Sequence, residues 1–147
     1  MPTASVKKII SCSKENLIKM VLDIEKYPEF VPWCIGGKIN KITDKGQSVE
    51  IIAELTIGKS FFKETYNSFV VYKKKLDSIS VTNINGPLKH LDNKWFFKKI
   101  GNKSEIDFQI DFELKNKILN LLISKSFDLG LKKIANAFEK RAIDLFK

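Results

Sequence analysis

Few side chains in this sequence have the chemistry of a catalytic or metal-binding group. The chain contains one histidine, His90, and two cysteines, Cys12 and Cys34, which stand far apart and form no CxxC or CxxH pair. A zinc site needs several such ligands at short spacing, so we expect no metal. The cysteines are expected to be reduced, half-buried thiols. His90 has no cysteine or serine partner at a recognisable spacing and is expected to be structural or exposed.

A row of carboxylates near residue 110 is the other candidate for acid–base chemistry or for a divalent metal. These acids alternate strictly with apolar residues, which places them on the wet face of a strand and the apolar residues on its dry face. The acids are Glu105, Asp107, Asp111 and Glu113, and the apolar residues are Ile106, Phe108, Ile110, Phe112 and Leu114. Solvated carboxylates on the surface of a strand are common in proteins and do not by themselves indicate a catalytic or metal site. Glycine-rich phosphate loops, GxSxG and HExxH are also missing from the sequence, so it predicts no catalytic constellation.

Two aromatic segments could instead build a binding site. Tyr27–Cys34 combines three aromatic residues with Pro28 and Pro32, which push the residues before them, Tyr27 and Val31, towards an extended conformation. A bent, stiff segment of this kind is typical of the rim of an apolar pocket or of a patch that touches lipid. The alternative to a binding site is that Phe30 and Trp33 simply fill the core.

The second aromatic segment is Gly86–Phe97, in which a Gly-Pro turn leads into a strand that carries Trp95, Phe96 and Phe97. Side chains alternate between the two faces of a strand, so the register decides whether Trp95 or Phe96 points inward.

The elements that must position these segments begin with a strand at Ala4–Ser11 and a helix capped by Ser13 that runs to about Glu25. Period-two patterning then predicts a sheet. Its expected strands are Val49–Ile57, Ser60–Tyr72, Ser78–Ile84, Leu91–Lys98 and Glu105–Leu114. A turn at Gly58-Lys59 is expected to join the first two of them.

The C-terminal segment carries an apolar stripe at steps of three and four residues, which predicts one long helix. The stripe consists of Leu119, Ile123, Phe127, Leu131, Ile134, Phe138, Ala142 and Leu145. Such a helix must cover the dry face of the sheet. We therefore expect an α+β helix-grip fold, a curved antiparallel sheet wrapped around the long helix, as a single domain over residues 1–147.

Composition narrows the environment and the partners. The 147 residues carry a net charge of +9, which favours an anionic partner, either nucleic acid or a membrane surface, although a lysine-rich composition can also serve solubility. The longest apolar run is Phe69–Tyr72, too short to span a bilayer, and the N-terminus lacks the core of a signal peptide. We expect a cytoplasmic protein, with peripheral contact at the inner membrane as an option.

Three blocks of the sequence resemble a known family. Asp23–Cys34, with its Tyr-Pro-x-Phe-x-Pro-Trp-Cys motif, Asn85–Phe97 and Ile110–Lys117 are similar in type and order to START-like, polyketide cyclase/dehydrase-type (Bet v 1-like) domains. That family includes the coenzyme Q-binding proteins and the bacterial ribosome association toxins. The similarity covers essentially the whole chain.

The resemblance implies a non-enzymatic carrier that holds ubiquinone, as a bound ligand, in a tunnel between the sheet and the long helix and supports respiratory electron transport. It implies one mouth formed by Tyr27, Phe30, Val31, Pro32 and Trp33, a wall formed by Trp95 and Phe97, and a movable lid formed by Leu119, Leu122, Ile123 and Phe127. A polyprenyl tail is nearly insoluble in water, so a carrier needs an enclosed apolar slot rather than reactive groups.

Two other readings of the resemblance stay open. A ribosome association toxin would bind the large ribosomal subunit and block subunit joining, and the segment Lys115–Lys147 holds eight Lys/Arg against three acids. A basic helix serves equally well to hold a carrier at an anionic membrane. A polyketide cyclase or aromatase would need acids and bases in the pocket, and the sequence places none there. The oligomeric state and any antitoxin partner are not predicted.

Overall fold

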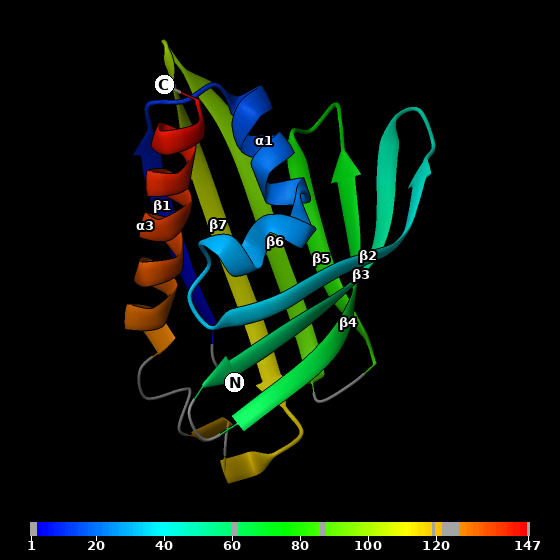
Figure 1. Cartoon of the computed structure of the whole chain (residues 1–147). Coiled ribbons are helices and arrows are strands. Elements are labelled where there is room, and N and C mark those ends of the chain that lie inside the picture. The colour runs from blue at the N-terminus through cyan, green and yellow to red at the C-terminus, as the bar shows by residue number, and fades with distance from the viewer. Residues whose placement is uncertain (1–2, 60–61, 86–87, 119, 122–126, 147) are drawn as a thin grey trace.

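The computed structural model describes residues 3–59, 62–85, 88–118, 120–121 and 127–146. One antiparallel sheet has the strand order β1-β7-β6-β5-β4-β3-β2, and α3 lies across its concave face (Figure 1). The strands are β1 (Thr3–Ile10), β2 (Cys34–Asp44), β3 (Ser48–Lys59), β4 (Phe62–Lys73), β5 (Ser78–Asn85), β6 (Leu88–Ile100) and β7 (Lys103–Leu114), and the helices are α1 (Lys14–Leu22), the 3-10 helix η1 (Ile24–Glu29) and α3 (Phe127–Leu145). The predicted α+β helix-grip architecture is confirmed.

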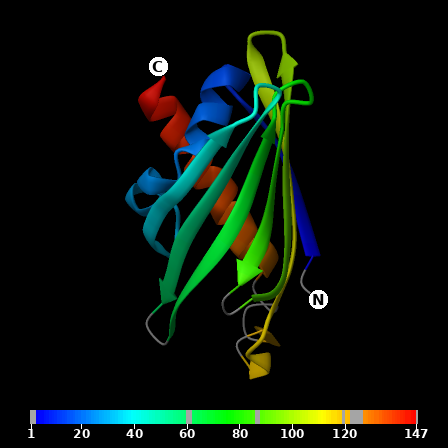
Figure 2. The ribbon, with the colours of Figure 1, turned by 90° about the vertical axis from the view of Figure 1, so that its right-hand side faces the viewer.

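The sheet curves strongly around α3 (Figure 2). Register shifts interrupt the pairing in β2, between β4 and β5 beside Ser68, and between β6 and β7 near Leu88. An extra residue at such a point bends the strand and increases its twist. The irregularities therefore help to convert a flat sheet into the curved layer that the helix can fill.

Helix α1 begins where the sequence predicts and ends earlier. The Ser13 hydroxyl accepts a hydrogen bond from the backbone N–H of Asn16 at 3.3 Å, which satisfies one free donor of the first turn. The helix stops at Leu22 instead of Glu25, and η1 follows it. Tyr27 therefore lies in a 3-10 helix, and the prediction of an extended conformation there was wrong. Pro28 is tolerated because its fixed φ is close to the 3-10 value.

The prediction of a turn at Gly58-Lys59 was also wrong. Pairing of β3 with β4 continues to Gly58 opposite Lys63 and Lys59 opposite Phe62, so the connection lies at residues 60–61, outside the described residues. Strand β2, which the sequence analysis did not delimit, packs against η1. A Cβ atom on Gly37 of β2 would lie 2.5 Å from the carbonyl oxygen of Ile24, so only glycine permits this approach.

The apolar stripe of the C-terminal helix is confirmed in its described part, with one exception. Leu131, Phe138 and Ala142 are buried, whereas Leu145 is 51% exposed and the neighbouring Phe146 packs against the core instead. Phe146 lies four positions after Ala142, and its backbone N–H donates to the Ala142 carbonyl oxygen at 3.0 Å, so Phe146 continues the buried side of the helix in place of Leu145. Leu119 and Ile123, the first stripe positions, lie outside the described residues, and Phe127 opens α3.

Candidate functional site

A cavity of about 340 Å³ lies among the concave face of the sheet, η1, the segment after it, and α3. This volume is within the range of small-molecule sites, which is about 300–1,000 Å³. From the sheet it is lined chiefly by Leu55, Ile57, Tyr66, Ser68, Val70, Ile79, Val81, Leu91, Asn93, Trp95, Phe108, Ile110, Phe112 and Leu114. In the part of the chain that the structure describes, no charged side chain lines it.

The structure brings part of the sequence-predicted site together at this cavity. Its lining includes Tyr27, Val31, Pro32, Trp33 and Trp95. From α3 it includes Gly130, Leu131, Ile134 and Phe138, which the sequence analysis did not assign to a site. Apart from Trp95, the strand residues of the lining were missed as well, although their alternation along β3 to β7 could have identified them.

Other predicted site residues lie elsewhere or cannot be placed. Phe30 is not part of the lining, and its ring packs edge-to-face on Phe138 at 5.0 Å. Phe97 is buried beside the cavity, where its ring stacks on Trp95 at 6.2 Å. Phe96 is 41% exposed on the outer face, so the register directs Trp95 inward. Leu119, Leu122 and Ile123 lie outside the described residues, as does the side chain of Phe127.

An aromatic wall closes one side of the cavity. Phe138 of α3 makes edge-to-face contacts with two other rings. Its ring centroid lies 5.6 Å from that of Tyr27 of η1 and 5.2 Å from that of Trp95 of β6. Trp95 in turn contacts Phe108 of β7 at 4.4 Å. Ring pairs of this geometry add to the energy of simple burial. The wall therefore ties four elements together, α3, η1, β6 and β7, and holds the helix at a set distance from the sheet.

Trp33 is held against α3 in an unusual backbone conformation. Its φ is 64°, in the left-handed region that a bulky residue rarely occupies. The backbone N–H of Gly58 donates to the Trp33 carbonyl oxygen at 2.9 Å, which anchors the segment to β3. A Cβ atom on Gly130 would lie 3.2 Å from the Trp33 ring. The glycine inside α3 therefore allows the indole to approach the helix.

Most polar groups around the cavity already have protein partners. The Tyr27 hydroxyl donates to the carbonyl oxygen of Val21. The indole N–H of Trp95 donates to Oδ1 of Asn93 at 2.9 Å, and Nδ2 of Asn93 donates to the carbonyl oxygen of Gln109 at 2.9 Å. These bonds fix the orientation of the rings and of the amide.

The hydroxyl of Ser68 is a buried lining group without such a partner in the described part of the chain. Ser68 is 1% exposed, and within the described residues its Oγ has no hydrogen-bond partner. A buried hydroxyl without a partner costs about 1–3 kcal/mol. Such a group in a native fold calls for an explanation.

The titratable side chains that line the cavity, in the part of the chain that the structure describes, are neutral at physiological pH. Burial raises the pKa of both the Tyr27 and the Tyr66 phenols above their ordinary range. Burial also raises the pKa of the Cys34 thiol, against a smaller opposing contribution from a backbone hydrogen bond at Gly36. None of these groups is poised as an anionic nucleophile or as a general base.

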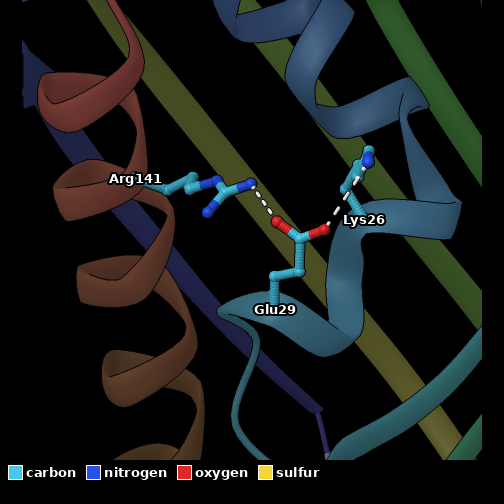
Figure 3. A network of polar contacts seen from close by, with 3 residues as sticks. All are labelled: Lys26, Glu29 and Arg141. Atoms are coloured by element: carbon cyan, nitrogen blue, oxygen red, sulfur yellow. Dashed lines mark hydrogen bonds and ion pairs between the residues drawn. The ribbon is translucent and has the colours of Figure 1, made fainter.

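A polar network joins η1 to α3 beside the aromatic wall (Figure 3). Nη2 of Arg141 donates to Oε1 of Glu29 at 2.7 Å, and Nζ of Lys26 lies 3.6 Å from Oε2 of the same carboxylate. The guanidinium also lies over the Phe30 ring at 5.1 Å. The hydrogen bond from Arg141 is the main reason why the pKa of Glu29 is lowered.

The remaining candidates for chemistry lie apart from this cavity. His90 is paired with Asp111, with Nε2 of the ring 3.5 Å from Oδ2, and neither residue lines the cavity. Over the described ranges, no group of three or more His, Cys, Asp and Glu side chains could hold a metal ion. No helix in those ranges is long and apolar enough to cross a membrane.

Several known proteins are similar to this chain over nearly its whole length. A protein of Rickettsia prowazekii named "Ribosome association toxin RatA" is 34% identical over 143 residues, which is 95% of each chain. "Coenzyme Q-binding protein COQ10, mitochondrial" of Dictyostelium discoideum is 29% identical over 147 residues, covering 98% of this chain and 70% of that protein. The solution structure of the 18 kDa protein CC1736 from Caulobacter crescentus is 31% identical, with a TM-score of 0.81 and coverage of 99% and 98%.

The family described as polyketide cyclase / dehydrase and lipid transport matches residues 12–139. These residues include η1, the whole sheet except β1, and α3 as far as Glu139, so the match covers the elements that enclose the cavity. The resemblance inferred from the three sequence blocks is thereby confirmed. The chain belongs to this family of polyketide cyclase / dehydrase and lipid transport proteins.

Proposed function

We propose that this protein binds ubiquinone, or a similar polyprenyl lipid, in the cavity and carries it in support of respiratory electron transport. The observation that carries the proposal is the cavity itself, which has about 340 Å³ of space and mostly apolar walls. Each buried CH₂ group of a lipid contributes about 0.8 kcal/mol to binding. The name of the Dictyostelium relative, a coenzyme Q-binding protein, supports the same class of ligand.

The chemistry of the cavity favours binding over catalysis. Burial keeps the phenols of Tyr27 and Tyr66 and the thiol of Cys34 protonated, and the carboxylates of β7 lie outside the lining. Cyclisation of a polyketide needs a group that can take up a proton. We therefore propose that the ligand leaves the protein chemically unchanged, and that the protein acts in the cytoplasm with peripheral contact at the inner membrane.

Extraction of the native protein tests the lipid. Protein purified from its own host is extracted with organic solvent, and the extract is analysed by mass spectrometry; we expect a ubiquinone. Val70→Phe is the matched variant, because Val70 is buried and lines the cavity, so a phenyl ring there fills the space. The variant should fold and yield no quinone. An extract of the unmodified protein without any polyprenyl lipid would contradict the proposal.

Association with the large ribosomal subunit is the second candidate function. The Rickettsia relative that is 34% identical carries the name of a ribosome association toxin, and the net charge of +9 suits an RNA partner. On α3, Lys132 and Lys133 are exposed and free to contact phosphates.

Co-sedimentation separates the two functions. Binding to large subunits that weakens steeply with salt, and that is lost on reversal of charge at Lys132 and Lys133 but kept in Val70→Phe, would support the ribosomal role. The charge-reversal variant should keep its quinone, because neither lysine lines the cavity. Equal loss of both activities in both variants would indicate unfolding instead.

A further inference from the structure

Two serines are fully buried in the sheet, and they differ in one respect. Ser104 on β7 is 0% exposed and donates to the Cys12 carbonyl oxygen at 2.6 Å. Ser68 on β4 is equally buried, but within the described residues its Oγ has no partner. Ser68 lines the cavity and Ser104 does not. The unpartnered hydroxyl thus belongs to the cavity and is not a general property of serine in this sheet.

The surroundings of Ser68 leave its hydroxyl to the cavity. In the sheet it pairs with Ala53 on one side and with Asn83 on the other, and Oδ1 of Asn83 accepts from the backbone N–H of Leu91. Ala53 has no polar side-chain atom. Tyr66 and Val70, two positions away on the same strand, share its face and also line the cavity. A hydrogen-bonding partner must therefore come from whatever occupies the cavity.

The charges and size of the cavity limit that occupant. Among the described residues no charged side chain lines the cavity, so a carboxylate, phosphate or ammonium group would be desolvated there without compensation. The volume of about 340 Å³ is at the lower end of the range for drug-sized ligands. It suits a ring and the adjoining part of a tail, while a long polyprenyl chain has to extend beyond it.

We propose that Ser68 binds the polar ring of the lipid, which enters the cavity first. The Ser68 hydroxyl donates to an uncharged carbonyl oxygen of the oxidised ring or accepts from a hydroxyl of the reduced ring, since a serine hydroxyl can do both. The tail lies towards the outside. This inference rests on the proposed lipid-binding function and adds the orientation of the ligand, the residue that recognises it and the requirement for a neutral ring.

The test compares two ligands on three proteins. The ligands are a short-tailed ubiquinone and a benzene that carries the same tail but no ring oxygen. The proteins are the unmodified chain, Ser68→Ala and, as a matched control, Ser104→Ala, and binding is measured by titration. One hydrogen bond corresponds to a change in affinity of about 3- to 10-fold. We expect Ser68→Ala to bind the quinone more weakly by that factor and to bind the benzene with unchanged affinity. Ser104→Ala should keep the affinity of the unmodified chain for both ligands.

Each other outcome overturns the inference. Unchanged quinone affinity in Ser68→Ala would leave lipid binding intact and remove the role of the hydroxyl. An equal loss for the quinone and the benzene would show that Ser68 acts only by shaping the cavity. Failure of the unmodified protein to bind either ligand would refute the proposed function, and the inference with it. A thermal unfolding curve for each variant confirms that the compared proteins are folded.

Discussion

The two sides of the aromatic wall differ sharply in packing around three of its rings, Phe138, Trp95 and Phe108. On the side that faces β3 to β6 lies the cavity of about 340 Å³, and on the side that faces β1 the remaining space is about 20 Å³. The same three rings contribute to the lining of both. The difference shows that the hollow is local, and that one row of rings separates it from a closely packed core.

The side chains on each side explain the difference. The cavity lining includes the small or short residues Ser68, Val70 and Gly130 beside larger ones such as Tyr66, whereas Ile10 and Ile106 help to fill the opposite side. Protein interiors are otherwise close-packed. A volume of this size is thus produced by residue choice at a few positions and kept open by the wall and the anchored indole of Trp33.

Truncation of the wall is expected to have the largest effect. Phe138 is buried and contacts Tyr27, Phe30 and Trp95, so Phe138→Ala should lower the free energy of unfolding by about 3–5 kcal/mol and join the two spaces. Denaturant titration measures the change. Phe96→Ala, on the exposed face, is the control and should change stability far less. A small effect at Phe138 would mean that the wall does not separate the two sides.

Added volume should distinguish the two sides directly. Ile106→Phe places extra atoms in the packed side and should cost about 1–3 kcal/mol through overpacking. Val70→Phe adds a phenyl ring on the cavity side and should leave the free energy of unfolding close to that of the unmodified chain. Both residues are buried in inward-facing strand positions, which makes the pair a fair comparison. Equal losses in thermal or denaturant unfolding would contradict the idea of a local hollow.

The two buried serines extend the comparison to polar groups. Ser104→Ala leaves the Cys12 carbonyl oxygen without its donor and should cost about 1–2 kcal/mol. Ser68→Ala removes a hydroxyl that has no partner in the described chain, so the ligand-free protein should be as stable as before or more stable. Denaturant unfolding of ligand-free protein measures both. A loss at Ser68 as large as that at Ser104 would point to a protein partner for its hydroxyl.

The smallest effect is expected at the polar network that joins η1 to α3. Arg141 lowers the pKa of Glu29 in the folded state, so the pair stabilises the fold fully above the ordinary carboxyl pKa. That stabilisation is lost as the pH falls through the lowered value. Glu29→Gln should flatten the dependence of the melting temperature on pH in this acidic range and change little at neutral pH, because the Glu29 side chain is 50% exposed and solvent screens the pair. An unchanged pH profile would show that other carboxylates dominate.

Much of the fold could be predicted from local patterns. The alternation in Glu105–Leu114 correctly identified β7 and its buried face, and the described part of the apolar stripe correctly identified the covering helix. The errors fell where tertiary contacts override local preference. Tyr27 lies in a 3-10 helix in which its hydroxyl bonds to Val21 and its ring packs on Phe138, and neither contact is readable from the residues around Pro28. The extent of the domain over residues 1–147 and the four proposed lid residues remain predictions.

Period and residue type along the chain were sufficient to identify the antiparallel sheet, its dry face and the helix that covers it, and the resemblance of three sequence blocks to known proteins identified the family. These properties depend on neighbours in the sequence. Only the tertiary structure decided that the space between sheet and helix is hollow on one side of Phe138, that Trp33 rests on Gly130, and that Ser68 faces the hollow without a partner in the described chain. A cavity depends on how far apart two packed layers stand, and that distance is set by contacts between residues remote in the sequence.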